Sequence, residues 1–363
     1  MEAGPVGLAA VGDLMLGDSA VCVGYGLRSR YAGADADRLF EGVKPLFEGA
    51  GLVFGNLETV LSLSGLDPTS LSSAQMRGDP SFAGLLRRTG FDVVSVANNH
   101  AVQHGVAAFE ETVALLREVG ITPCGLRGTA PWGSEPAVLT REGARIGFLG
   151  YCLRPRQYGR DEPPFAEGTP FEILADVRRL RPTVDHVVVS LHWGEEFVPT
   201  PSAAEVTLGR SIVDAGAALV LGHHPHVVRP VERHRGGVVA YSLGNFAADM
   251  IWQRRLREGV VLRCTLGPGG VADVQVTPTL IGGDFRPAVA GPARSPADAL
   301  PGGMPEPEYR RAVARSVRAQ QLASYAYALA NARRYPRPIL VQLLTRTLRN
   351  KIAGLLPSRA AGG

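Results

Sequence analysis

The sequence predicts a layered α/β fold with a pair of mixed sheets, followed by a helical C-terminal extension. Over the first 260 residues, short apolar runs alternate with amphipathic stretches, which is typical of strands followed by helices. Two further pairs of strand-like runs are joined by Glu142-Gly143 and Gly236-Gly237, and such junctions indicate antiparallel hairpins. The combination favours two mixed sheets over one purely parallel sheet.

The expected strands are short, rich in β-branched residues and bounded by glycine or aspartate. They cover residues 6–11, 52–54, 93–97, 146–151, 187–191 and 217–221. Between several of them the composition and spacing predict helices over 35–49, 81–90, 106–120, 171–181 and 203–216. The hairpins pair 137–141 with 145–151, and 229–233 with 238–242.

The C-terminal part has a different composition. Residues 282–307 are rich in glycine, proline and alanine, which predicts an irregular connector. Residues 308–331 and 338–356 have helical composition, and an apolar residue recurs every four positions at Leu340, Leu344, Leu348, Ile352 and Leu356. This row predicts a helix packed on the main domain or, alternatively, an interfacial or partner-binding amphipathic helix. We therefore divide the chain into a main domain (1–285), a connector (286–307) and a basic helical extension (308–363).

Composition and charge exclude several classes of protein. With 45% hydrophobic and 20% charged residues among 363, the chain is neither disordered nor a coiled coil, and no apolar run is long enough to span a membrane. The net charge of +4 is uneven, because residues 301–363 carry +9 and residues 1–300 carry −5. A mildly acidic body argues against a nucleic-acid groove. Four widely spaced cysteines and the lack of a visible secretory signal favour reduced thiols in a cytoplasmic protein.

Potential metal ligands follow five of the predicted strands. These strands run into Asp13, into 55–58, into 98–100, into 192–196 and into 222–226, and six of the eight histidines lie in or beside these segments. Taken singly, Asp13 could be a turn residue and His192 a buried core histidine. Three histidines within 223–226 are harder to explain as core residues, because burying unpartnered imidazoles is costly. Since sites in α/β sheets gather at the carboxyl ends of strands, the joint pattern predicts a metal site.

The residue types narrow the metal and the chemistry. Asp, Glu, Asn and His without cysteine suit one or two divalent ions such as Mn²⁺, Fe²⁺ or Zn²⁺. Two such ions can clamp a phosphoryl or acyl oxygen and lower the pKa of a bridging water. The sequence contains neither a GxxxxGK[ST] loop nor a GxSxG elbow, so nucleotide binding and serine hydrolysis have no support.

Six ordered segments carry a family resemblance. They are VGDLMLGD (11–18), FGNLETVLS (54–62), VSVANNHAVQHG (94–105), SLHWGEEF (190–197), GHHPHVVRPVE (222–232) and YSLGNF (241–246). The chain resembles the CapA family of poly-γ-glutamate capsule biosynthesis proteins in the order and separation of these segments, over roughly residues 5–285. This family has a calcineurin-like metallophosphoesterase fold. The resemblance implies a four-layer α/β/β/α sandwich of two mixed sheets, with a metal centre at the strand ends.

The resemblance also implies roles for individual residues. Asp13 matches a first ligand, Asn56 or Glu58 the bridging position, and Asn99 the amide ligand. His192, His224 and His226 match imidazole ligands, while His223 is ambiguous because the histidine run allows two alignments. His100 corresponds to a general acid, Glu196 to a base, a substrate contact or an orienting residue, and Asn245 to a buttress. Arg77 is a candidate anion contact, with an exposed, solvated arginine as the alternative.

Two positions depart from the pattern that the resemblance implies. Met15 stands where phosphoesterases place a histidine ligand, and Gln103 stands where family members commonly have an aspartate. Both changes reduce ligand strength or anionic charge. The sequence is therefore compatible with a centre that binds one ion tightly and one weakly, and also with a centre that no longer turns over substrate.

Three hypotheses of function follow. The first is a metal-dependent hydrolase of phosphoester or amide bonds, acting on a small-molecule or polymeric anionic substrate such as a glutamyl polymer. The second is a non-catalytic accessory of polymer synthesis or export, whose basic helices (308–363) meet a protein, an acidic polymer or the surface of a membrane. The third is amide-bond formation at the same metal centre, which the sequence does not separate from hydrolysis.

Overall fold

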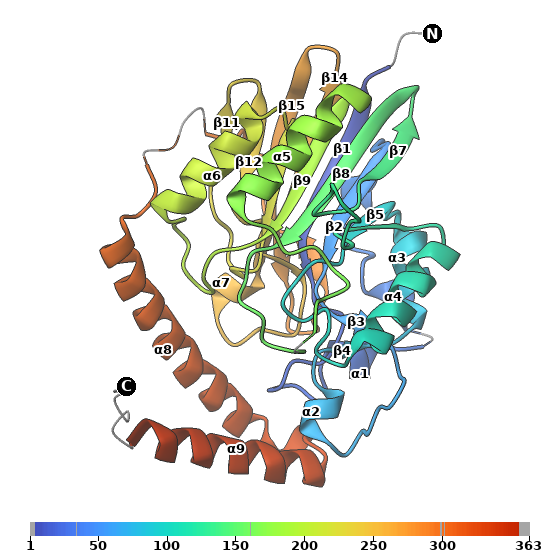
Figure 1. Cartoon of the computed structure of the whole chain (residues 1–363). Coiled ribbons are helices and arrows are strands. Elements are labelled where there is room, and N and C mark those ends of the chain that lie inside the picture. Colours follow the sequence, from blue (N-terminus) through green and yellow to red (C-terminus); the bar gives the residue numbers. More distant parts are fainter. Residues whose placement is uncertain (1–3, 34, 160, 298–299, 301, 356–363) are drawn as a thin grey trace.

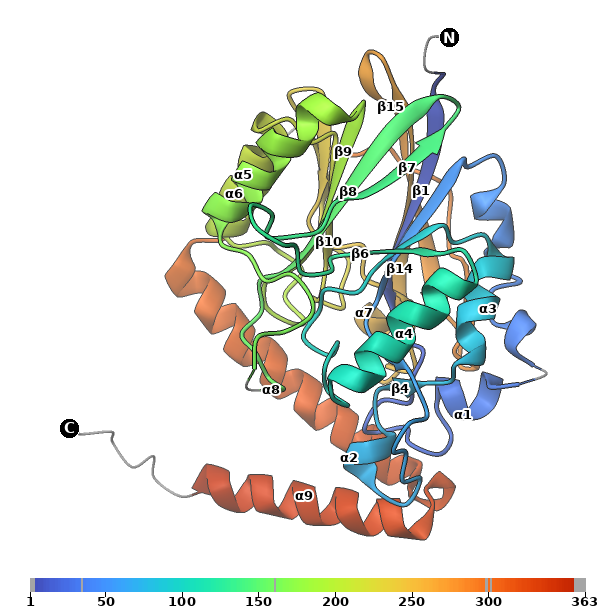
Figure 2. The same cartoon turned by 45° about the vertical axis from the view of Figure 1, so that its right-hand side comes forward.

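Two β-sheets face each other and helices cover their outer faces. The computed structural model describes residues 4–355 except 34, 160, 298, 299 and 301, and side chains as far as Arg346. Figures 1 and 2 show the two sheets side by side, with α3 (Ser81–Thr89) and α4 (Val106–Glu118) outside one sheet and α5 (Pro170–Leu180) and α6 (Ala203–Asp214) outside the other. The predicted α/β/β/α sandwich of two mixed sheets is therefore confirmed.

The first sheet has the order β16-β15-β14-β1-β2-β5-β6, with β13 paired to β1. Strands β1, β2, β5, β6 and β13 run parallel to one another, while β14, β15 and β16 are joined antiparallel. The strands are β1 (Val6–Leu14), β2 (Leu52–Leu57), β5 (Val93–Ser95), β6 (Thr122–Cys124), β13 (Asn245–Ala247), β14 (Glu258–Gly267), β15 (Gly270–Ile281) and β16 (Pro287–Val289).

The second sheet has the order β11-β12-β10-β9-β8-β7, with a parallel centre and an antiparallel strand at each edge. Its edge pairs β7–β8 and β11–β12 are the two predicted hairpins. The strands are β7 (Ala137–Arg141), β8 (Ala144–Cys152), β9 (His186–His192), β10 (Leu219–His223), β11 (Val231–His234) and β12 (Gly237–Ala240), and β3 (Val60–Leu61) pairs with β4 (Arg77–Gly78) outside both sheets.

The core lies in three layers that follow from this arrangement. Between the sheets, Phe54 and Phe148 stack with ring centroids 6.0 Å apart, amid buried Val, Leu and Ile side chains. Separate apolar clusters lie between each sheet and its helices. Helices α5 and α6 each begin with a capping box, in which Thr169 with Glu172, and Ser202 with Glu205, satisfy the free backbone N–H groups of the first turn.

The predicted helix over 35–49 is wrong. This stretch contains only two short 3₁₀ helices, η1 (Ala36–Arg38) and η2 (Lys44–Phe47), because Gly42 and Pro45 interrupt the helical pattern. The predicted connector also differs in one part, since β16 lies within it and extends the first sheet. The remaining helices are α1 (Leu27–Tyr31), α2 (Leu71–Ala74), α7 (Arg254–Arg257), η3 (Arg181–Thr183), α8 (Glu306–Ala330), η4 (Ala332–Arg334) and α9 (Arg337–Leu355).

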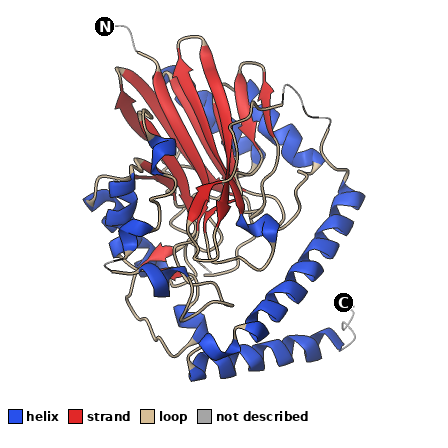
Figure 3. Cartoon of the chain, turned by 180° about the vertical axis from the view of Figure 1, so that it is seen from behind, coloured by secondary structure: helices blue, strands red, loops and turns tan. Residues whose placement is uncertain are grey.

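The two C-terminal helices lie along the outside of the sandwich, and Figure 3 shows them meeting at an angle below it. Helix α8 is anchored by Tyr309 and Ala312, which pack on Val198. Helix α9 is anchored by the buried side chains of Ile339 and Leu343.

The apolar row predicted for the last helix holds at its first position, since Leu340 packs on the cluster that anchors α9, but not at its second. The side chain of Leu344 is exposed, whereas the buried row runs through Tyr335, Ile339 and Leu343. The side chains of Leu348 and Ile352, and residue Leu356, lie outside the described part. No helix within the described residues is long and apolar enough to cross a membrane. The four cysteines are buried free thiols, as predicted.

Candidate metal centre

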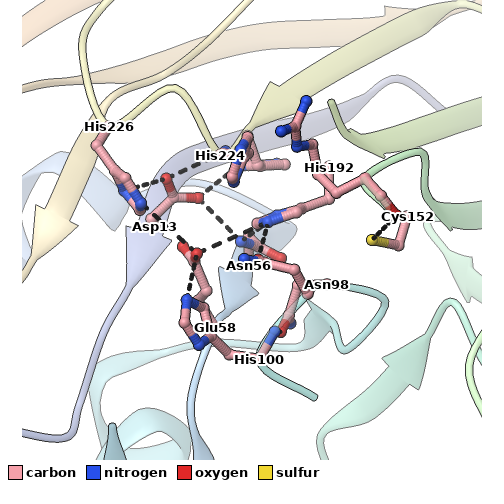
Figure 4. Close-up of polar contacts among 12 residues, drawn as sticks. Asp13, Asn56, Glu58, Asn98, His100, Cys152, His192, His224 and His226 are labelled. Carbon is pink, nitrogen blue, oxygen red and sulfur yellow. Dashed lines mark hydrogen bonds and ion pairs between the residues drawn. The ribbon is translucent and has the colours of Figure 1, made fainter. Parts of the chain in front are cut away.

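The predicted ligands meet at the carboxyl-terminal edge of the two sheets (Figure 4). At the end of β1, Asp13 lies in register with Asn56 on β2 and with Asn245 on β13. In the other sheet, His192 at the end of β9 lies in register with His223 at the end of β10. Because the parallel strands of each sheet end at the same edge, residues far apart in the sequence are brought together.

Two groups of side chains have the geometry to hold a metal ion. One comprises Asp13, Glu58 and His192, and the other comprises Glu58, His224 and His226. Within each group the ligand atoms all lie within 4.8 Å of one another. Glu58 belongs to both, and its Oε1 lies 3.7 Å from Nε2 of His192 and 3.7 Å from Nε2 of His226. Glu58 therefore lies where a single carboxylate can serve both groups.

Several buried polar atoms in the centre lack a hydrogen-bond partner. They are Oδ1 of Asn56, both carboxylate oxygens of Glu58 and both ring nitrogens of His223 and His224. Buried polar atoms in folded proteins are normally hydrogen-bonded, so this concentration of free lone pairs needs a ligand to satisfy it. Oxygen and imidazole donors of this kind suit a divalent ion, and Mn²⁺, Fe²⁺ or Zn²⁺ fits the set.

The histidine turn after β10 has an unusual backbone. His224 and His226 have φ values of 92° and 56°, in the left-handed region that residues other than glycine rarely adopt. The turn is held in place by the backbone N–H of His224, which donates to Oδ2 of Asp13 at 3.3 Å, and by the N–H of Phe197, which donates to the carbonyl of Pro225. Backbone strain of this kind clusters at functional sites, and here it directs two imidazoles toward Glu58.

Burial and neighbouring charges perturb the ionisable groups of the centre. Burial lowers the pKa of His192 and of His224 well below the usual value, so both rings are neutral. Burial opposes the charge of Asp13, but the imidazoles of His223 and His226, each 3.4 Å from a carboxylate oxygen, hold the pKa of this carboxyl well below its usual range. Burial raises the pKa of Glu58 well above its usual value, and the neighbouring charge of Asp13 raises it further.

Two predicted amides bind the imidazoles. Oδ1 of Asn99 lies 2.7 Å from Nε2 of His192, and Oδ1 of Asn245 lies 3.0 Å from Nδ1 of His226. The side-chain amide of Asn245 also donates to the carbonyl of Leu256. Asn245 thus orients His226, which is the arrangement expected of a buttress.

His100 lies at the mouth of the centre. Its side chain is 16% exposed, whereas those of His192 and His226 are almost completely buried. Nδ1 lies 2.7 Å from Oε1 of Gln103, an acceptor, so this nitrogen carries the proton of the neutral ring and Nε2 is left to accept one. Nε2 lies 3.9 Å from Oε1 of Glu58. Burial lowers the pKa of His100 to about 4.

The two departures from the family pattern have different consequences. Gln103 keeps a hydrogen bond to His100 but supplies no negative charge. Met15 is buried in an apolar cluster with Met76 and Val227, and it is in neither ligand group.

Glu196 is partly buried, and its negative charge raises the pKa of Glu58.

The structure bears on two site residues whose roles the sequence left open, Arg77 and His223. Arg77 is buried rather than exposed, and its guanidinium donates to the backbone carbonyls of Ser62, Ser64 and Ser73. These contacts make it a support for the loop after β3 and give no support to an anion contact. His223 lies 3.4 Å from Oδ1 of Asp13 through its Nδ1 but is in neither ligand group, which favours the alignment through His224 and His226.

Sequence reasoning missed the loop after β8. Its Gln157 accepts a hydrogen bond from the Asn99 amide at 3.2 Å, and the ring of Tyr158 lies 6.0 Å from that of His100. On the same loop, Arg154 binds the Glu195 carboxylate at 2.8 and 3.1 Å. Strand β8 ends at the same edge as β9, so the strand-end rule could have found this loop, although its residue types are not metal ligands.

A family model described as "Bacterial capsule synthesis protein PGA_cap" matches residues 7–250, which include all the residues of both ligand groups. The chain belongs to this family. The predicted CapA resemblance is thereby confirmed. Among its relatives, "PGA biosynthesis protein CapA" of Bacillus subtilis is 27% identical over 288 residues, covering 78% of this chain and 73% of the relative.

Two further comparisons concern more distant proteins. A "Probable polyglutamine synthesis accessory protein" of Mycobacterium tuberculosis is 26% identical over 212 residues, covering 53% of this chain and 54% of the relative. The crystal structure of a hypothetical protein from Thermus thermophilus overlaps with a TM-score of 0.47 at 17% identity, covering 75% of this chain and 98% of that one.

Proposed function

We propose that the chain is a metal-dependent hydrolase of phosphoester or amide bonds that acts in the synthesis of an anionic polymer. The observation that carries this proposal is the pair of buried ligand groups that share Glu58. The names of its relatives, which refer to polyglutamate and capsule synthesis, support the choice of polymer. Formation of an amide bond at the same centre would use the same residues.

The ligand groups define what the centre would do. A divalent ion bound by Asp13, Glu58, His192, His224 and His226 would act as a Lewis acid and would lower the pKa of water. Asn99 and Asn245 orient two of the imidazoles through their side-chain oxygens. These amides restrict ring rotation, so the ligand nitrogens keep their direction when substrate enters.

His100 is the proposed proton donor. It is the most exposed of the imidazoles in the centre that contact Glu58, and its Nε2 faces the ligand groups while Gln103 holds its Nδ1. Because Nε2 carries no proton in the neutral ring, it would first take the proton that the attacking water releases and then pass it to the leaving oxygen or nitrogen of the substrate. The ring of Tyr158 lies beside that of His100, with centroids 6.0 Å apart.

An anionic substrate is favoured by Arg154. Its guanidinium is mostly buried beside the carboxyl ends of β8 and β9, where Nη1 donates to the carbonyl of Gly194 and to Glu195. Its Nε has no hydrogen-bond partner. A substrate carboxylate or phosphate at this edge would accept a hydrogen bond from this Nε, beside the ion pair of Arg154 with Glu195.

The experiment is hydrolysis of bis-p-nitrophenyl phosphate and of γ-glutamyl-p-nitroanilide with Mn²⁺, Zn²⁺ or Mg²⁺. We expect His100→Ala to lower turnover by about 10²–10⁴-fold. The same variant should keep its metal content, because His100 is in neither ligand group. The matched control is His234→Ala, which removes a histidine that pairs with Asp214 at the end of β11. Unchanged turnover in His100→Ala would remove this residue as the proton donor.

A second candidate is a non-catalytic accessory of polymer synthesis. Two observations favour it, namely Met15 in place of a histidine ligand and the name of the Mycobacterium tuberculosis relative. If wild-type protein binds metal but hydrolyses neither probe with any of the three ions, the accessory function is supported and the hydrolase proposal fails.

A further inference from the structure

One face of α8 combines positive charge with exposed apolar side chains. Arg311, Arg315, Arg318, Leu322 and Leu329 follow each other at intervals of four, three, four and seven residues, which places all five on the same side of a helix. All five side chains are exposed to solvent. We refer to these five residues as the α8 stripe.

The arginines of the α8 stripe have no acidic partner. Within the described part of the chain, Arg311, Arg315 and Arg318 form neither an ion pair nor a side-chain hydrogen bond, whereas the adjacent Arg310 pairs with Glu306. They also lie beyond the first turn of α8, where the helix dipole has little effect on a charge. Neither pairing nor the dipole therefore explains three cations on one face.

The leucines of the α8 stripe are among the most exposed apolar side chains of the protein. Leu322 is 64% exposed and Leu329 is 67% exposed. On α9, Val341 is 63% exposed and Leu344 is 51% exposed. The described residues include nine exposed large hydrophobic side chains, and four of them lie on α8 and α9. Exposed apolar side chains are therefore concentrated on these two helices, which form a small part of the chain.

We propose that the α8 stripe docks on an anionic lipid bilayer, with its leucines entering the headgroup region and its arginines binding lipid phosphates. A helix that lies in the membrane interface combines these two features on one surface. The charge distribution favours this orientation, because residues 301–363 carry +9 and residues 1–300 carry −5. The helix also lies along the outside of the molecule, so a flat surface can reach it (Figures 1 and 3).

Two other occupants fit the α8 stripe less well. A soluble polyanion would bind the arginines but would leave Leu322 and Leu329 in water. A second copy of the chain would bury the leucines, but it would also have to desolvate three unpaired guanidinium groups. A membrane accepts both features, because arginine binds the headgroups while the leucines enter the acyl boundary.

The test is cosedimentation of the full chain with vesicles of phosphatidylcholine alone or of phosphatidylcholine mixed with phosphatidylglycerol. We expect binding to the mixed vesicles and little binding to phosphatidylcholine. Changing all three stripe arginines to glutamine should weaken binding by about 100-fold, since each contributes about fivefold. Leu322→Ser with Leu329→Ser should weaken binding by about tenfold or more. That loss should remain at high salt, where the electrostatic part is screened.

The control variants remove the same groups from the main domain. Arg38, Arg87 and Arg88, changed to glutamine, test the loss of three exposed guanidinium groups, and Val138→Ser with Val289→Ser tests the loss of two exposed apolar side chains. Both should bind the mixed vesicles as wild type does. All of the substituted stripe side chains are exposed, so each variant should keep the wild-type melting temperature.

Three results would overturn the proposal. The first is no binding of wild type to the mixed vesicles. The second is binding to soluble poly-L-glutamate that depends on the arginines, together with vesicle binding that is indifferent to the leucines. The third is concentration-dependent self-association that the leucine variant abolishes, without vesicle binding. None of these results depends on hydrolysis, so failure here is distinct from failure of the proposed activity.

Discussion

Replacing Glu58 by glutamine gives the most direct test of the metal centre. Glu58 is completely buried, it is shared by both ligand groups, and neither of its carboxylate oxygens has a hydrogen-bond partner. Glutamine keeps the size and shape of the side chain but replaces one oxygen by an amide nitrogen, which is not a metal ligand. Both ligand groups should therefore weaken at once, whereas the fold without metal should change little.

The size of the effect follows from binding linkage and from the length of the chain. A metal present at about 100 times its dissociation constant stabilises the folded state by about 2.7 kcal/mol. For 363 residues the entropy of unfolding is about 0.8 kcal/mol/K, so this stabilisation raises the melting temperature by about 3–4 °C. Loss of the shared ligand should weaken binding by about 100-fold or more, which leaves a rise of about 0.5 °C at the same metal concentration.

The assay is thermal unfolding of wild type and Glu58→Gln, each with and without added Mn²⁺ or Zn²⁺. Glu118→Gln is a suitable control, because Glu118 is exposed at the end of α4. The control should retain the full rise in melting temperature. If Glu58→Gln shows the same metal-induced rise as wild type, Glu58 is not the shared ligand and the two-group geometry does not describe the centre.

Two further predictions concern groups around the centre. Asn245→Ala should reduce metal affinity by about 10–100-fold in isothermal titration, because His226 loses the oxygen that orients it; unchanged affinity would show that Asn245 does not position His226. Asp249 has a pKa raised to about 7 by burial and then by the charge of Asp18, and Cys22 also lies beside it. Because this folded pKa exceeds the usual value of 3.8, protonated Asp249 stabilises the fold at low pH, and that stability falls as the pH rises from about 4 through 7. For the wild type, the free energy of unfolding measured with urea should fall by an amount on the order of a few kcal/mol between pH 5 and 8. Asp249→Asn, which imitates the protonated form, should remove this fall. An unaltered pH dependence in the variant would contradict the assignment.

Local patterns determined most of the sandwich. Short β-branched runs and the two glycine-containing turns predict β7–β8 and β11–β12 correctly, because strand propensity and turn chemistry act over a few residues. The stretch 35–49 differs from its prediction because its composition suggests a helix, while Gly42 and Pro45 prevent one from continuing.

The same local reasoning identified the candidate ligands but not their arrangement. Strand ends predict that Asp13, His192 and the histidines of 223–226 gather at one edge, since parallel strands end together. The place of Glu58 in both groups, and the histidines that face it, depended on the packing of one sheet against the other and on the left-handed turn at His224 and His226.

In the C-terminal helices, too, some properties follow from the sequence and others only from the tertiary structure. Their basic charge and their helical character are properties of the sequence, because both are sums over nearby residues. The face that each helix buries was decided by the tertiary structure, where Ile339 rather than Leu344 meets the main domain. A regular apolar row constrains only the angle between side chains around a helix, whereas the buried face depends on the shape of the surface that the rest of the chain presents to it.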